Sequence, residues 1–84
     1  MPKVSRRFWF LFPTSQQVER PIIWEMSRKH PDVIFDIRQA SVQNEKGVMA
    51  VLLEGEADQV QAAVEFCRAA GLQVDPIEKS VVEG

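Results

Sequence analysis

The 84-residue chain is poor in the residues that build most compact metal-binding or nucleophilic sites: it has one cysteine, Cys67, and one histidine, His30. A single cysteine cannot close a disulfide within the chain, which argues against a disulfide-rich secreted scaffold. One histidine, one cysteine and scattered acidic residues do not form the ligand set of a metal centre. The glycine-rich loops that hold nucleotide phosphates, G-x-x-x-x-G-K-[ST] and G-x-G-x-x-G, are also absent. We therefore expect no catalytic residues, no cofactor and no metal.

Long hydrophobic runs are missing as well. The longest apolar run near the N-terminus, residues 8–13, is too short for a signal peptide and far below the roughly 20 residues of a membrane span. This predicts a cytoplasmic protein without membrane insertion. The net charge of −2 argues against nucleic acid as a partner, because phosphate neutralisation supplies much of the affinity for nucleic acids.

The residues that are present have the composition of one ordinary globular domain, with 45% hydrophobic and 26% charged residues. The apolar periodicity predicts strand, helix, strand, strand, helix, strand. The first helix carries Val18 and Met26 on one stripe and ends at His30 before Pro31, and Gly71 caps the second helix. The strands are predicted at 4–12, 33–42, 48–54 and 72–77, with a turn at 44–47.

Two strand–helix–strand units predict an α+β, ferredoxin-like sandwich. Right-handed crossovers place both helices on one face of a four-stranded antiparallel sheet with the strand order 4-1-3-2. We expect a single domain over residues 4–78, with flexible termini at 1–3 and 79–84.

The sheet face opposite the helices has no predicted element to cover it, yet both central strands are apolar on both sides. Either the side of Trp9 and Leu11 or that of Phe8, Phe10 and Phe12 must face away from the helices. An apolar patch of this kind marks an interaction surface unless edge loops and the C-terminal tail cover it. The residues that we assign to an interface, in a homodimer or with another protein, are Trp9, Leu11, Met49, Val51 and Leu53. The third strand offers an alternative set on its other side, namely Val48, Ala50 and Leu52.

RNA-recognition modules use the same order of elements and stack bases on aromatic residues of the third strand. When their motif is aligned at Lys46 and Gly47, the aromatic positions are occupied by Val48, Ala50 and Leu53. None of these side chains can stack on a base, so the sequence does not predict RNA binding.

Several segments, in this order and spacing, resemble a NIL domain over about residues 6–77. In the first half they are FWFLF at 8–12, PII at 21–23 and FDIRQA at 35–40. In the second half they are MAVLLEG at 49–55, V-x-x-A-V-x-F at 60–66 and A-G-L-x-V at 70–74.

The resemblance implies a ferredoxin-like regulatory module similar to amino-acid-sensing domains. NIL domains are best known from the ATPase subunit of methionine importers, where they pair, bind methionine and restrain transport. Carried over to this chain, the ligand-contacting positions are Asp36 and Ile37, with Pro21 at the start of the first helix. The family usually has asparagine where this chain has Asp36. A carboxylate there would repel the carboxylate of an amino acid and attract its ammonium group.

We therefore expect a small regulatory module that binds L-methionine or a related amino acid as a homodimer. The alternative is an interaction domain that binds a protein partner in trans without a small ligand. The stand-alone length, with no ATPase before the domain and no iron–sulfur cysteines after it, fits this alternative. An enzyme has no support in the residue inventory.

Overall fold

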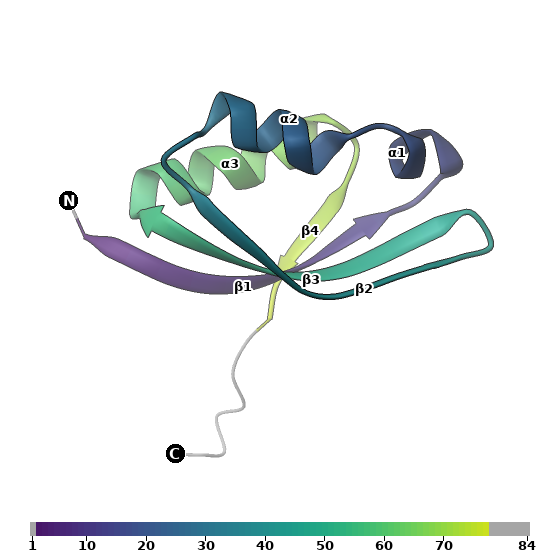
Figure 1. Cartoon of the computed structure of the whole chain (residues 1–84), viewed down its shortest axis with the longest axis horizontal. Helices are drawn as coiled ribbons and strands as arrows, with labels where there is room; N and C mark the ends of the chain where they lie inside the picture. Colours follow the sequence, from purple (N-terminus) through teal and green to yellow (C-terminus); the bar gives the residue numbers. More distant parts are fainter. Residues whose placement is uncertain (1, 78–84) are drawn as a thin grey trace, which may run out of the picture.

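The computed structural model describes residues 2–77. The elements, in chain order, are β1 (Lys3–Phe12), α1 (Ser15–Glu19), α2 (Ile22–Lys29), β2 (Ile34–Gln43), β3 (Lys46–Glu56), α3 (Ala57–Ala69) and β4 (Gln73–Pro76). All three helices lie on one side of the sheet (Figure 1). This is the α+β, ferredoxin-like architecture that the sequence predicts, with one additional short helix.

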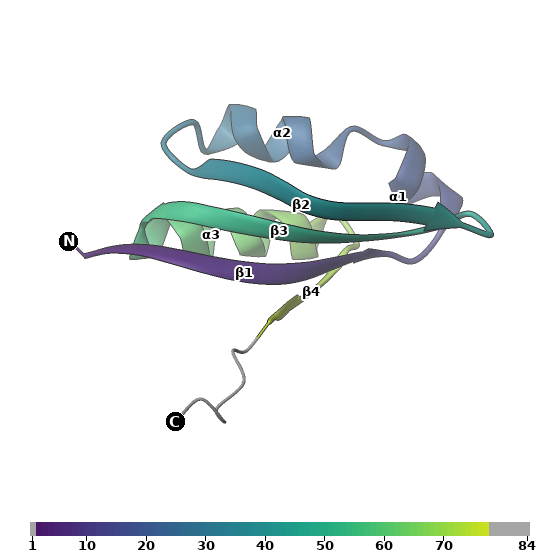
Figure 2. The same ribbon diagram turned by 60° about the horizontal axis from the view of Figure 1, so that its bottom comes forward.

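The four strands form one antiparallel sheet in the order β2-β3-β1-β4, which is the predicted order counted from the other edge (Figure 2). Phe8 lies opposite Val51 and Phe10 lies opposite both Met49 and Val74. Because successive side chains of a strand point to opposite faces, this register fixes which residues meet the helices.

The hydrophobic core lies between the sheet and the helices. Phe8, Phe10 and Phe12 of β1 point toward α2 and α3 and are buried, with the rings of Phe8 and Phe10 edge-to-face at 6.4 Å. The same core includes Ile22 and Met26 of α2. From β3 and α3 it receives Val51, Leu53, Val60, Ala63, Val64 and Cys67. The helical stripes predicted from the sequence therefore do face the sheet.

The first helical region is divided into two helices at Arg20 and Pro21. A residue before proline is disfavoured in the helical region, and Arg20 is extended, with φ −81° and ψ 134°. Pro21, with φ −80° and ψ 63°, lies at the centre of an inverse γ-turn, in which the Ile22 amide donates to the Arg20 carbonyl at 2.7 Å. The prediction of one continuous first helix was therefore wrong: α1 ends at Glu19, and α2 starts in a new direction after Pro21.

The β2–β3 hairpin closes through Asn44 and Glu45, both with positive φ, of 53° and 65°. Two positive φ values are typical of a type I′ turn, whose twist suits a hairpin. In the middle of β2, before this turn, the register with β3 shifts between Ile37 and Gln39, which leaves Arg38 as the extra residue of a β-bulge. The sequence predicts the turn but not the bulge.

Lys3, predicted to lie in a flexible terminus, starts β1, and residues 79–84 of the other predicted terminus lie outside the described residues. Within residues 2–77, none of the helices is long and apolar enough to cross a membrane.

Candidate ligand-binding groove

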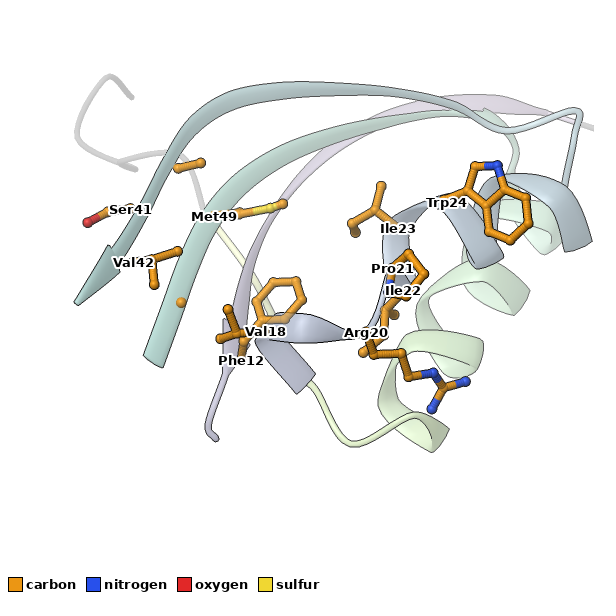
Figure 3. A pocket seen from close by; sticks show the side chains of 12 residues that line it. Phe12, Val18, Arg20, Pro21, Ile22, Ile23, Trp24, Ser41, Val42 and Met49 are labelled. Atoms are coloured by element: carbon orange, nitrogen blue, oxygen red, sulfur yellow. The ribbon is translucent and has the colours of Figure 1, made fainter. Parts of the chain in front are cut away.

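An apolar groove runs between the start of α2 and the ends of β2 and β3 that adjoin their hairpin. It encloses about 230 Å³. In Figure 3, Ile23 of α2 faces the groove from one side, and Met49 of β3 and Val42 of β2 lie on the other. The lining residues are Phe12, Val18, Arg20, Pro21, Ile22, Ile23, Trp24, Ala40, Ser41, Val42, Gly47 and Met49.

Local sequence explains why the groove is open. The turn at Pro21 ends α1 and redirects the chain. Gly47 contributes no side chain to the floor, where an added Cβ would meet Phe12 and Val18 at 3.4 to 3.5 Å. On the β2 side, the side chain of Ala40 is small and Val42 is 62% exposed, so this wall of the groove is shallow and open to solvent.

The charged group at the groove is Arg20. Its guanidinium donates to the Glu25 carboxylate from Nε, at 3.2 and 3.1 Å, and from Nη2, at 2.6 Å. These hydrogen bonds lower the pKa of Glu25 and raise that of Arg20. Since the Ser41 side chain is the other polar lining group, the groove suits an apolar group, with charged atoms kept near Arg20 or in water.

Trp24 forms one end of the groove and is 58% exposed. Arg28, one turn further along α2, places its guanidinium carbon 5.3 Å from the centre of the indole ring. Sequence periodicity marks Trp24 only as lying opposite Ile22 and Met26 on the helix, and it does not reveal the groove beside it.

The three predicted ligand-binding residues do not converge on one site. Pro21 lines the groove. Ile37 pairs with the buried Val51 and so lies on the helix side of β2, but it is not part of the lining. Asp36 pairs with Leu52, on the face of the sheet away from the helices, where its carboxylate lies 3.3 Å from Nε of Arg38.

The predicted interface residues also separate between the two faces. Trp9, 41% exposed, and the partly buried Leu11 lie on the open face. Val51 and Leu53 are 0% exposed in the core, so their assignment to an uncovered surface is wrong. Met49 lines the groove instead. The β3 residues that accompany Trp9 and Leu11 on the open face are Val48, Ala50 and Leu52.

The structure places Cys67 in the core and His30 against the ring of Phe66. Cys67 is fully buried on α3, and burial raises the pKa of its thiol to about 12. A thiol in this environment stays protonated and is a poor nucleophile. The ring of His30 packs edge-to-face on Phe66, with centres 6.2 Å apart. In the part of the chain that the structure describes, no three metal-ligating side chains form a cluster.

The chain matches the NIL domain over residues 11–76, which span most of its elements and both walls of the groove. The chain belongs to the NIL domain family. No curated protein sequence matches it. The family therefore comes from the domain match, in agreement with the segments quoted from the sequence.

Solved structures resemble the fold of this NIL domain. The C-terminal domain of an ABC transporter ATP-binding protein from Enterococcus faecalis superposes with a TM-score of 0.75 at 24% identity, covering 89% of this chain and 86% of that one. The de novo designed protein Foldit4 superposes with a TM-score of 0.59 at 14% identity, covering 94% of this chain and 100% of that one. At these identities the likeness concerns the fold.

Proposed function

We propose that this NIL domain is a regulatory module without catalytic activity that binds a small amino acid with an apolar side chain in the groove between α2 and β2. L-methionine is the first candidate. Membership of the NIL family and the likeness to a domain attached to a transporter ATP-binding protein support a regulatory role. The observation that carries the proposal is the apolar groove of about 230 Å³ itself.

The size and lining of the groove favour such a ligand. Drug-sized ligands occupy pockets of roughly 300–1,000 Å³, so a smaller hollow suits a metabolite of amino-acid size. Each methylene group of the ligand that leaves water for the surface of Ile23, Val42 and Met49 contributes about 0.8 kcal/mol. Arg20 at the groove offers a cation for the ligand carboxylate, in competition with Glu25.

Tryptophan fluorescence tests this proposal, because the two tryptophans lie on opposite faces of the sheet. The Trp9→Phe variant retains Trp24 as its only indole, at the groove, and the Trp24→Phe variant retains Trp9, on the open face. Titration with L-methionine is expected to change the emission of the Trp9→Phe variant in a saturable way. The Trp24→Phe variant is the matched control and is expected to change little.

Isothermal titration calorimetry of the unaltered chain extends the test to L-leucine, L-norleucine and L-serine. Apolar side chains are expected to bind and serine to bind far more weakly, because the groove offers it little apolar contact to replace water. Absence of heat and of fluorescence change with all of these amino acids would contradict the proposal.

The alternative function is an interaction domain that binds a protein in trans. The open face favours it, because Trp9, Leu11, Val48 and Leu52 form an apolar strip along the two central strands. A specific partner retained by the unaltered chain and lost from a Trp9→Ser variant, but not from a Trp24→Ser variant, would support this alternative.

A further inference from the structure

A second hollow lies on the open face of the sheet, on the other side from the groove. It encloses about 450 Å³, and its lining includes Arg7 and Trp9 of β1, Ala50 of β3, and Arg38 and Gln39 of β2. Both charged side chains of this lining are cationic. The hollow therefore combines an indole with two guanidinium groups, and its chemistry differs from that of the apolar groove.

Ala50 forms the floor of the hollow. It lies opposite Trp9 on one neighbouring strand and opposite Gln39 on the other. The next residues of β3 on this face, Val48 and Leu52, have larger side chains. The space above Ala50 is therefore free beside the indole. Trp9 is 41% exposed, and its ring offers a surface on which a flat aromatic group stacks.

The β-bulge brings one of the two cations to the hollow. In a regular strand, consecutive side chains point to opposite faces of the sheet. Here Gln39 lies opposite Ala50 on the open face, and the ion pair with Asp36 places the Arg38 guanidinium on that face as well. Bulges are over-represented next to active sites, where they re-aim a side chain in this way.

Arg7 supplies the second cation, from the central strand β1. It lies two residues before Trp9 and so shares its face of the sheet. Within residues 2–77, the Arg7 guanidinium takes part in no ion pair. The backbone carbonyl of Arg7 accepts a hydrogen bond of 2.9 Å from the Ile77 amide, which keeps Ile77 at the edge of the hollow.

Two carboxylates lie near the hollow without lining it. Asp36 is 3.3 Å from Nε of Arg38, but both side chains are more than half exposed, and a surface ion pair of this kind is weak. Asp75 lies opposite Trp9 on β4 and accepts a hydrogen bond of 3.0 Å from Nε2 of Gln73. An anion in the hollow would therefore compete with an exposed carboxylate for Arg38 only.

We propose that this hollow binds a small anion with a flat aromatic body. The ring stacks on Trp9 above Ala50, and the carboxylate or phosphate of the ligand is held between Arg7 and Arg38. Guanidinium groups bind both kinds of anion through paired hydrogen bonds. The hollow and the groove lie on opposite sides of the sheet, so this site stands or falls independently of amino-acid binding in the groove.

Benzoate and phenyl phosphate are the probes, and the Trp24→Phe variant, whose only indole is Trp9, is the reporter. Each probe is expected to change its emission in a saturable way, and the probe that binds more tightly identifies the anionic group. Benzamide has the ring without the charge and is expected to bind at least about tenfold more weakly. The Trp9→Phe variant is the matched control: its Trp24 lies at the groove, and its emission is expected to stay unchanged.

Calorimetry of charge variants locates the bound anion. Arg7→Gln and Arg38→Gln are each expected to weaken binding of the tighter probe about tenfold, because each removes a charged donor. Lys46→Gln removes the same charge at the hairpin end of β3 and is expected to bind as the unaltered chain does. All three positions are exposed, and circular dichroism verifies that the variants fold.

Three results would overturn the proposal. One is the absence of a saturable response to either probe up to about 10 mM, a range that includes millimolar affinity. Another is binding of benzamide as tight as that of both anions, which would show that the arginines do not select the ligand. The third is equal weakening by Lys46→Gln and by the two arginine variants, because net charge alone would then explain the binding.

Discussion

Arg68 on α3 is hydrogen-bonded to Val74 on the edge strand β4: its Nη2 donates a hydrogen bond of 2.7 Å to the Val74 backbone carbonyl. The same guanidinium contacts the Glu65 carboxylate at 3.0 Å. β4 has only four residues, so this contact from the helix supplements a short ladder with β1.

Removal of the Arg68 side chain is expected to destabilise the domain by about 1 kcal/mol, because a partly buried carbonyl loses a charged donor. Urea unfolding of Arg68→Ala measures this loss. Glu65→Ala is the matched control: it removes the exposed ion pair and keeps the bond to Val74, so it is expected to change stability by less than about half as much. Equal losses in the two variants would contradict the role assigned to the carbonyl.

Gly71 ends α3 in a conformation that other residues rarely adopt, with φ +102°. The Leu72 amide donates to the backbone carbonyl of Cys67, and the Gly71 amide donates to the backbone carbonyl of Arg68. This is the pattern of a Schellman motif with glycine at C′. Gly71→Ala is expected to cost about 1–3 kcal/mol in unfolding free energy through backbone strain.

An added Cβ at Gly71 would also lie 2.7 Å from Nε2 of Gln17. The double variant Gly71→Ala with Gln17→Ala removes this contact and keeps the backbone strain. If strain dominates, the double variant is expected to stay nearly as destabilised as the single one. Full recovery in the double variant would show that the side-chain clash, and not φ, sets the cost.

Burial of Cys67 makes stability depend on alkaline pH. The pKa of its thiol rises from the ordinary 9.0 to about 12 on folding, so the unfolded chain loses the proton first as the pH rises. The contribution of the protonated Cys67 thiol to the free energy of unfolding is fully present below about pH 9 and is lost between pH 9 and about 12. Over that range the free energy of unfolding falls by up to about 1.4 kcal/mol per pH unit.

Urea unfolding of the unaltered chain and of Cys67→Ala, from neutral pH to about pH 10.5, tests this. The difference in unfolding free energy between the two is expected to be constant up to about pH 9 and then to shrink, since alanine does not titrate. A constant difference over the whole range would show that the folded thiol ionises as readily as the unfolded one.

The sequence predicts both core stripes because their residue patterns are local, and it predicts the strand order because the crossovers are right-handed. Alternation along β1 shows that Phe8 and Trp9 face opposite ways, but both sides are apolar, so alternation alone does not show which side meets the helices. The choice of Val51 and Leu53 for the open face was wrong for the same reason. That choice depends on the pairing of Phe8 with Val51, which the hairpin and crossover geometry fix and which a slip of one residue would reverse.

The break before Pro21 follows from the restriction that proline places on Arg20, so it was accessible to sequence reasoning. The groove was not accessible to sequence reasoning, because it depends on the distance between α2 and an edge strand far away in the chain. Nothing in the local sequence around Ala40 and Val42 indicates that they line a binding groove. The bulge at Arg38 also has no clear local signal, yet it decides the faces of the second half of β2.

Filling the groove offers the sharpest test of where a ligand binds. Ala40→Phe adds a ring to an exposed position of the groove wall without touching the core, so it is expected to abolish methionine binding while stability changes by less than about 0.5 kcal/mol. Gln39→Phe, the preceding residue, places the same ring on the open face and is the matched control, expected to bind as the unaltered chain does. Calorimetry measures binding and urea unfolding measures stability. If methionine binds to the unaltered chain and Gln39→Phe abolishes binding while Ala40→Phe retains it, the ligand site lies on the open face near Asp36 and not in the groove.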